Sequence, residues 1–388
     1  MTVDTHPSTH PPLPPTTEDD RLSWLRLLRS RRVGIATFYR LLSEHGTAQN
    51  ALRALPDIAA AAGVGRYAPC PEGVAMAELR AGADHGATLL AVTDKAYPAA
   101  LREIPDPPPI LWAKGDVSAL NRPMIAIVGA RNASSLGLRV ARAMARDLGQ
   151  QGFVTVSGLA RGIDTAAHVS TLDTGTVAVM AGGVDVMYPA ENTRLAEDIT
   201  AKGLRLSENA MGLAPQARHF PRRNRIISGL ARAVVIVEAA AKSGSIITAR
   251  NALDQGREVL AVPGHPFDAR AAGCNMLIRD GARLVRSAAD VIEALPDGTH
   301  PARREPDQTS LPLEGEKRRS LREVASLHDS ILDRLGPSPL AEDQLIRDLE
   351  AEAKDVSSVL VDLELEGRIT RQAGGLLSLA ADGSRAAR

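Results

Sequence analysis

Apolar side chains recur along this chain in two different rhythms. Between residues 21 and 87 they follow helical spacing, as at Trp24, Leu25 and Leu28, which predicts a small helical domain. From residue 124 onward the rhythm becomes a series of short apolar runs, each followed by a segment with helical spacing. The runs predict strands at 124–129, 153–157, 176–181, 204–207, 233–237, 258–262 and 282–285. Apolar strands that alternate with helices indicate a parallel sheet covered on both faces, with ligand-binding loops after the strands.

The same pattern divides the chain into folded parts at 21–87, 88–296 and 321–380. In the last part, helical segments precede a hairpin-like segment around Gly374 and Gly375, which predicts a winged helix. Its third helix is rich in Asp and Glu, so we expect it to contact a protein rather than a DNA groove. We expect disordered tails at 1–20 and 381–388 and a linker at 297–320, where the sequence is polar or rich in Pro.

A glycine-rich turn lies inside the helical domain, where residues 63–66 read Gly-Val-Gly-Arg. It resembles a helix-hairpin-helix turn, which holds a DNA phosphate on backbone N–H groups at a helix N-terminus. The alternative is a plain helical bundle with a flexible turn. We favour the bundle because so short a pattern is weakly specific.

Composition excludes several classes of protein. The chain has 388 residues, 46 basic and 46 acidic side chains, and 44% hydrophobic residues, as in an ordinary globular protein. Its two cysteines, Cys70 and Cys274, lack metal-ligand spacing and indicate reduced thiols of a cytoplasmic protein. No apolar run approaches the roughly 20 residues that a membrane span needs, so we expect no membrane insertion.

The strongest chemical signal is a cluster of arginines on this neutral chain. Residues 210–237 contain five arginines and no Asp or Glu, and Arg222, Arg223, Asn224 and Arg225 lie at its centre. We expect this stretch to be a loop between two strands and its uncompensated charge to bind an anionic partner. Phe220 precedes the cluster, either as a stacking platform for a base or as an anchor that pins the loop.

Two earlier strand ends carry further candidates. Gly129 and Arg131 follow the first predicted strand, and serines next to them can cap a helix whose N-terminus favours a phosphate; a plain tight turn is equally compatible. Ser157 and Gly158 follow the second predicted strand. Asp164 and His168 then stand four residues apart, a spacing that permits a shared hydrogen bond. We favour a structural role for that pair over a catalytic one.

A later strand end has the sequence Lys242, Ser243, Gly244, Ser245. Its N–H and hydroxyl groups suit a phosphate, with a lysine beside them. The spacing lacks the pattern of an ATP-binding P-loop, so ATP hydrolysis is not supported.

These segments, in this order, resemble the DNA-processing protein A (DprA/Smf) family over residues 89–295. The resemblance is carried by residues 128–131, 157–168, 220–230, 238–249, 262–264 and 273–275. It implies an α/β fold with an extended Rossmann-like parallel sheet, a small N-terminal helical domain and a C-terminal winged helix. It also implies a homodimer that binds and protects single-stranded DNA and loads RecA recombinase onto it in natural transformation.

The resemblance also implies which residues bind the strand. Arg131, Arg223, Asn224, Arg225 and Lys242 would hold phosphates, with Phe220 near a base. The full predicted set of nucleic-acid-binding residues is Gly129, Arg131, Ser157, Gly158, Phe220, Arg222, Arg223, Asn224, Arg225, Lys242, Ser243, Gly244 and Ser245.

Two other functions stay open at this point. A Rossmann-like phosphoribohydrolase of the lysine-decarboxylase-like group would use Arg131 as a phosphate clamp and Glu238 as a catalytic acid, although the PGGxGTxxE signature of that group is absent. A scaffold that binds only proteins is the third possibility. We expect no catalytic residue, no metal and no cofactor.

Overall fold

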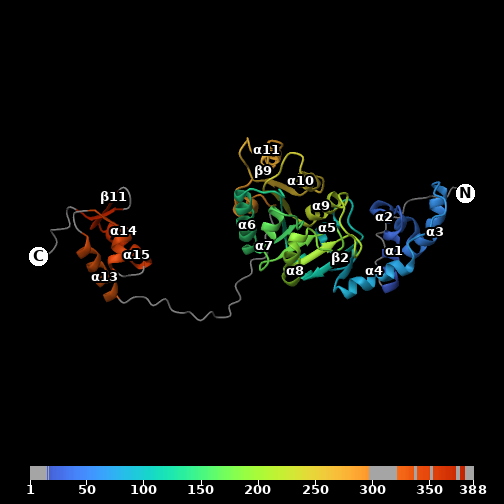
Figure 1. Ribbon diagram of the computed structural model, residues 1–388, viewed down its shortest axis with the longest axis horizontal. Helices are drawn as coiled ribbons and strands as arrows, with labels where there is room; N and C mark the ends of the chain where they lie inside the picture. Colours follow the sequence, from blue (N-terminus) through green and yellow to red (C-terminus); the bar gives the residue numbers. More distant parts are fainter. Residues whose placement is uncertain are drawn as a thin grey trace. The chain divides into compact units, whose positions relative to one another are not determined.

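The computed structural model describes residue 15 and residues 17–296, 321–335, 339–349, 353–372 and 376–380 (Figure 1). The predicted linker, the predicted C-terminal tail, the Gly374–Gly375 turn and most of the predicted N-terminal tail lie outside these residues. The chain splits into two units, residues 1–304 and 305–388.

The N-terminal domain is a bundle of four helices. The first begins at Glu18, inside the stretch predicted as a tail, because Thr17 and Asp20 form a reciprocal capping box. The bundle core includes an edge-to-face contact between Trp24 and Phe38, whose ring centroids are 5.2 Å apart. The helices are α1 (Glu18–Arg29), α2 (Ile35–His45), α3 (Ala48–Ala61) and α4 (Glu72–Asp84).

The glycine-rich turn of this domain does not lead directly into a helix. Gly63 has a φ of 75°, which glycine adopts without strain, and it ends the helix before it. The next helix, however, begins only at Glu72, seven residues after Gly65. The turn therefore lacks an adjoining helix N-terminus that would hold a phosphate.

A nine-stranded sheet forms the centre of the first unit. Its strand order is β1-β2-β6-β5-β4-β3-β7-β8-β9, and β3 to β9 run parallel to one another, as predicted. The sequence pattern missed that β1 and β2 extend this sheet as an antiparallel edge. The strands are β1 (Thr88–Ala91), β2 (Ile110–Gly115), β3 (Met124–Val128), β4 (Val154–Ser157), β5 (Thr176–Val179), β6 (Leu204–Ser207), β7 (Ala233–Ile236), β8 (Glu258–Ala261) and β9 (Arg283–Leu284).

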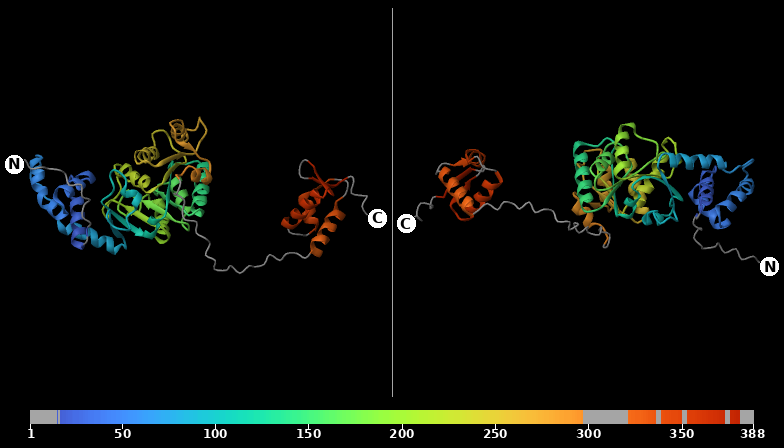
Figure 2. Two further views of the ribbon diagram at one scale, coloured as in Figure 1. Left: turned by 180° about the vertical axis from the view of Figure 1, so that it is seen from behind. Right: turned by 90° about the horizontal axis from the view of Figure 1, so that it is seen from below.

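Helices cover both faces of this sheet (Figures 1 and 2). Alternate strand residues divide between the two faces: Ala126 and Val128 pack on one side, whereas Ile125 and Ile127 pack on the other. The first face packs against α5 (Ala99–Arg102), α9 (His219–Leu230), α10 (Gly244–Asp254) and α11 (Ala272–Arg279). The second face packs against α6 (Ser135–Gln150), α7 (Ile163–Val169), α8 (Thr193–Lys202) and α12 (Ala288–Glu293).

The strand order places a topological switch at the middle of the sheet. The chain runs from β3 outward through β4 and β5 to β6, then returns to the other side of β3 as β7. The connections after β3 and β7 therefore diverge to opposite faces. Such a divergence leaves a crevice at the carboxyl ends of the two strands, where α/β proteins bind ligands.

The arginine-rich stretch is a helix, not the loop that we predicted. Residues 219–230 form α9, and its second half packs Ile226, Ile227 and Leu230 against the sheet. Ile226, Ile227 and Leu230 stand at positions one, two and five of this run, a spacing that fits one helical face, and this signal outweighs the cluster of charges before it. The consequence is that the arginines point in different directions instead of sharing one exposed surface.

The second unit is a winged helix, as predicted. A core of Ile331, Leu345, Leu360 and Leu377 joins its helices to a three-stranded sheet of order β10-β12-β11. The elements are α13 (Leu321–Arg334), β10 (Leu340–Ala341), α14 (Glu342–Leu349), α15 (Ala353–Leu365), β11 (Ile369–Gln372) and β12 (Leu376–Leu379).

Cys70 and Cys274 are both free and buried. Within the described ranges, no helix is both long and apolar enough to cross a bilayer. The same part of the chain contains no cluster of three or more His, Cys, Asp or Glu side chains suited to hold a metal ion.

A mostly buried ion pair within the helical bundle is also hydrogen-bonded to the sheet. Glu78 accepts two hydrogen bonds from Arg29, at 2.8 and 2.9 Å, and a third from the indole N–H of Trp112 on β2 at 2.9 Å. Removing the carboxylate would leave the indole N–H without its acceptor and the guanidinium without its ion-pair partner. Breaking a buried pair on one side is strongly destabilising.

We therefore predict that Glu78→Ala lowers the free energy of unfolding by about 3 kcal/mol in urea denaturation. The control is Glu72→Ala, which removes the exposed Arg26–Glu72 pair and should cost less than about 1 kcal/mol. Equal losses for the two variants would contradict this account of the junction.

Candidate nucleic-acid interface

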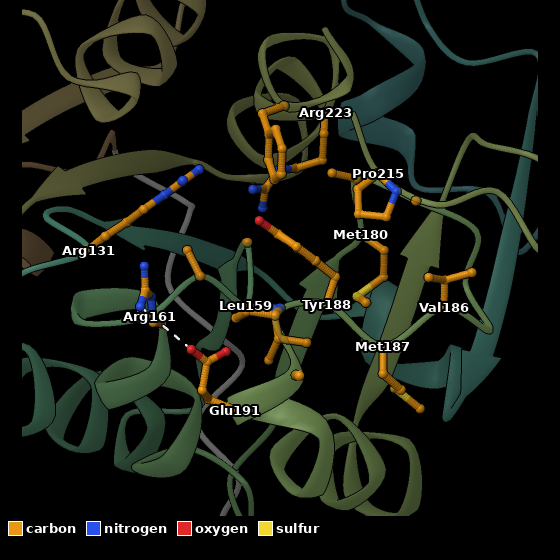
Figure 3. Close-up of a pocket in the computed structure, with 17 residues that line it drawn as sticks. Arg131, Leu159, Arg161, Met180, Val186, Met187, Tyr188, Glu191, Pro215 and Arg223 are labelled. Atoms are coloured by element: carbon orange, nitrogen blue, oxygen red, sulfur yellow. Dashed lines mark ion pairs between the residues drawn. The ribbon is translucent and has the colours of Figure 1, made fainter. Parts of the chain in front are cut away.

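Two adjoining cavities open at the carboxyl ends of β3, β4, β5 and β7. The larger, about 580 Å³, lies between the connection after β3 and the start of α10. The smaller, about 350 Å³, lies between the connections after β4 and β5 (Figure 3). Arg131, Ala160, Phe220 and Arg223 line both cavities. The larger cavity thus occupies the switch point of the sheet, and the smaller one extends it across β4 and β5.

Arg223 brings a buried positive charge to the wall shared by the two cavities. Its side chain descends from α9, and its Nη1 donates a hydrogen bond to the carbonyl of Val179 at 3.1 Å. A Cβ atom at Gly158 would lie 1.5 Å from this Nη1, so only glycine leaves room for the guanidinium. Burial lowers the pKa of Arg223 to about 10, although nearby Asp164 opposes the shift. The group therefore stays cationic at neutral pH.

The Asp164 carboxylate lies near the Arg223 charge. Asp164 and His168 do not share a hydrogen bond, because each has other partners. The Asp164 carboxylate accepts the N–H groups of Gly158 and Ala160, at 3.1 and 3.3 Å. His168 Nδ1 instead contacts the hydroxyl of Thr176 at 2.7 Å. Burial lowers the pKa of His168 to about 3, which keeps the ring neutral at physiological pH. These separate contacts support the structural role that we favoured for the pair.

Arg131 crosses the opening between the cavities. Its guanidinium carbon lies 5.2 Å from the ring centroid of Phe220, within range of a cation–π contact. The Phe220 ring also contacts Tyr188, with 5.8 Å between the ring centroids, and is only half-buried. In Figure 3, Arg131 and Arg223 point into the same space from different sides. The geometry accommodates both interpretations of Phe220, because the ring is held by its neighbours and still lines both cavities.

The start of α10 faces the larger cavity with a free helix end. Ser243 is its N-cap with an extended backbone, but its side chain makes no capping hydrogen bond. The hydroxyl of Ser245 fixes this end to β3 by donating to the carbonyl of Gly129 at 2.9 Å, and Asn224 Nδ2 donates to the carbonyl of Gly244 at 3.2 Å. Lys242 stands exposed just before the helix. N–H groups in the first turn, the helix dipole and a lysine together favour a phosphate here.

The start of α6, which we also considered for a phosphate, already holds an anion from the protein itself. The carboxylate of Glu238 accepts the backbone N–H of Ser134 at 2.9 Å and the Ser134 hydroxyl as well. Gly137 makes this possible, since a Cβ there would lie 2.4 Å from the Glu238 carboxyl carbon. The sequence expectation is corrected accordingly: the anion at this helix end is Glu238.

Four predicted residues line neither cavity: Lys242, which stands just before α10, and Arg225, Ser157 and Arg222. Arg225 points to the opposite side of α9, where it forms an ion pair with Asp106 at 3.2 Å and another with Glu208. Its charge is thus compensated, contrary to our expectation, by acids from distant parts of the sequence. Ser157 is fully buried and donates its hydroxyl to the carbonyl of Ile127 at 2.7 Å. Arg222 is exposed and lines neither cavity.

Sequence reasoning missed Arg270 and Asn132, both of which line the larger cavity. Arg270 follows β8, and its carbonyl accepts the N–H of Ala239 at 2.7 Å, which holds this loop against the end of β7. An arginine in the loop after a parallel strand was the available signal. Arg161, in the smaller cavity, pairs with Glu191 at 3.5 Å (Figure 3).

Family profiles match most of the chain. The profile of DNA recombination-mediator protein A matches residues 88–296, that of a DprA-like N-terminal HHH domain matches 18–81, and that of a DprA winged helix domain matches 315–375.

Individual relatives agree with these profiles. The DNA processing protein DprA of Bacillus subtilis is 44% identical over 217 residues, which cover 55% of this chain and 73% of that protein. Protein Smf of Escherichia coli is 35% identical over 294 residues, or 75% of this chain and 77% of that protein.

Solved structures are similar as well. The X-ray structure of DprA from Streptococcus pneumoniae matches with a TM-score of 0.56 and 36% identity, over 68% of this chain and 99% of that chain. DNA processing protein A from Helicobacter pylori, whose structure concerns its single-stranded DNA binding mode, matches with a TM-score of 0.50 and 30% identity, over 53% of this chain and 94% of that one.

The buried, neutral His168 leads to a prediction about pH. Its pKa of about 3 in the folded protein lies below the ordinary value of 6.5, so between these pH values only the unfolded chain binds the proton. The free energy of unfolding then falls as pH falls, by up to about 1.4 kcal/mol per pH unit from this group.

We predict that His168→Gln shows a shallower loss of stability than the wild type between pH 6.5 and 5, measured by urea denaturation at each pH. Because other groups titrate equally in both proteins, the difference between the two curves isolates His168. Parallel curves would show that His168 is not held neutral.

Proposed function

The chain belongs to the DNA recombination-mediator protein A (DprA/Smf) family, and on this basis we propose that it binds single-stranded DNA in the two adjoining cavities. The observation that carries the proposal is the junction of the cavities, where Arg131, Arg223 and Phe220 line both spaces. A mononucleotide needs one phosphate site and one pocket. Two connected cavities with cationic side chains between them and a free helix end beside them suit a continuous strand.

Each part of the groove has a physical role in this proposal. The start of α10 and Lys242 hold phosphates on the open side, and Arg223 supplies a fixed charge at the floor. The apolar wall of Met180, Val186 and Tyr188 in the smaller cavity accepts an unstacked base. Because phosphates and base faces are common to all sequences, we expect little sequence preference.

The phosphoribohydrolase alternative receives less support from this geometry. It needs Glu238 as a catalytic acid in the cavity, but this carboxylate is occupied by Ser134 at the start of α6. A free-base release assay with AMP tests the alternative directly, and base release by the wild type that is lost in Glu238→Gln would revive it.

We further propose that the protein acts in the cytoplasm as a homodimer, protects incoming strands and loads RecA recombinase onto them in natural transformation and recombination. The family description as a recombination mediator supports this role. The acid-rich third helix of the winged helix adds a surface that suits a protein partner better than DNA.

The first test compares two variants that each remove two exposed positive charges. Arg131→Ala/Lys242→Ala changes a residue that lines both cavities and the lysine just before α10, whereas Arg142→Ala/Arg146→Ala changes the exposed side of α6, which lines neither cavity. By fluorescence anisotropy, the groove variant should bind a labelled single strand at least about tenfold more weakly. Its salt dependence should also be shallower by about 1.4 in log–log slope, since two phosphate contacts are lost.

Wild type and the α6 variant should bind the strand alike and prefer it to a duplex competitor. Equal binding by all three proteins would place DNA binding outside the groove. Absence of binding by the wild type would leave the scaffold function as the better explanation.

The second test concerns the recombinase. We predict that the wild-type protein accelerates the formation of RecA filaments on single strands coated with single-strand-binding protein. The Arg131→Ala/Lys242→Ala variant should accelerate it less, because loading requires the strand to be held. A wild-type protein that binds the strand but leaves filament formation unchanged would refute loading while preserving DNA binding.

A further inference from the structure

One aromatic side chain stands almost entirely in solvent beside the groove. Phe267 is 94% exposed, whereas Phe38 and Phe153 are buried in the cores and Phe220 is half-buried. The chain has only four phenylalanines. A large apolar ring gains nothing from folding when it remains in water, so its position calls for a partner outside this chain.

The loop that carries Phe267 is fixed at both ends. Gly264 and Asn275 exchange two hydrogen bonds, in which the Gly264 N–H donates to the Asn275 side chain at 3.2 Å and the Asn275 amide donates back at 3.0 Å. At the other end, the Ala239 N–H donates to the carbonyl of Arg270 at 2.7 Å. The ring is therefore presented by a braced loop, so little conformational entropy is lost when it binds a partner.

The same loop also contributes to the groove. Arg270 lines the larger cavity together with the start of α10. Phe267 precedes Arg270 by three residues, so their Cα atoms are at most about 11 Å apart even along an extended chain. In a duplex, each strand carries one phosphate per roughly 3.4 Å along the helix axis. A strand that leaves the cavity past Arg270 thus reaches Phe267 within a few nucleotides.

The surroundings of the ring suit a base and its phosphates. His265 packs against Phe267 with 5.6 Å between the ring centroids. Arg270 is held by Asp268 at 3.0 Å but remains about half exposed. An exposed aromatic face flanked by a guanidinium and an imidazole is the combination with which proteins bind unstacked bases.

We propose that Phe267 is a second base-stacking platform, which binds the strand after it leaves the larger cavity past Arg270. The inference rests on the proposed function and extends its site from two cavities to the loop after β8. Stacking on a phenyl ring requires a base but no particular base, so this platform lengthens the bound strand without adding sequence preference. The alternative occupant, a second copy of this chain, predicts a different outcome below.

The most direct test is Phe267→Trp, read by tryptophan fluorescence. The two native tryptophans, Trp24 and Trp112, are buried. Fluorescence from a solvent-exposed indole therefore comes from the new residue. A single strand of about 15 nucleotides should quench this signal, whereas an abasic strand of equal length should not, because it offers phosphates without bases. Equal fluorescence with and without the base-bearing strand, while anisotropy shows it bound, would refute the proposal.

Affinity measurements with Phe267→Ala provide the second test. This variant should bind the base-bearing strand about 5- to 100-fold more weakly and the abasic strand as tightly as wild type. The control is Val169→Ala, which also removes an exposed apolar side chain, at the end of α7 and outside both cavities. It should leave both affinities unchanged.

The outcomes separate this inference from the proposed function. If wild type binds the strand and Phe267→Ala binds it equally well, stacking by Phe267 is refuted and the groove stands. If wild type binds neither strand, both fail. Sedimentation velocity without DNA decides the alternative occupant: a change of oligomeric state in Phe267→Ala, with unchanged DNA affinity, would assign the ring to an interface between copies of this chain.

Discussion

The burial of the Arg223 guanidinium is the constraint on which the site depends. A cation enters a protein interior only where polar groups replace its water, and here the Val179 carbonyl and the nearby Asp164 supply that replacement. The guanidinium needs the space that a Cβ at position 158 would occupy, which explains the glycine there. The helix that carries this arginine fixes the direction in which its side chain points. A charge fixed in this way loses little entropy when a phosphate or base arrives, unlike a lysine on the rim.

Two helix ends flank the first strand of the parallel sheet, and the protein uses them differently. The start of α6 is neutralised by Glu238, a residue that follows β7. The start of α10 receives no such carboxylate, and its cap serine makes no capping hydrogen bond. By filling one end and leaving the other free, the chain directs an anionic ligand toward the face that carries α9 and α10. This polarity would be lost if both ends were free, because each would attract a phosphate.

Much of this fold could be predicted from the sequence, and the site only partly. Short apolar runs located the parallel strands to within two residues, because burial on both faces leaves few alternatives to such runs. The pattern did not show that β1 and β2 join the same sheet, since pairing between distant strands is not written in local spacing. For the site, Arg131 and the start of α10 lie where strand ends predicted them. The absence of Asp and Glu between residues 210 and 237 predicted an uncompensated charge, and this prediction was wrong for Arg225. Its partners Asp106 and Glu208 lie outside that stretch and come close to it only in the fold.

The contacts of Arg225 also connect the site to the helical bundle of the same unit. Asp106 sits in a connector whose next residue, Pro107, accepts a hydrogen bond from Tyr39 in the helical bundle at 3.1 Å. Arg29 of the same bundle donates to the carbonyl of Glu208 at 3.5 Å. The bundle thus holds the backbone at or next to the two residues whose carboxylates pair with Arg225. Those ion pairs help to fix the rotation of α9, and with it the direction of the Arg223 side chain. The sequence predicts a domain boundary near residue 88, but these contacts cross it. A fragment that begins there would keep every groove residue and lose the bundle contacts that help to align them.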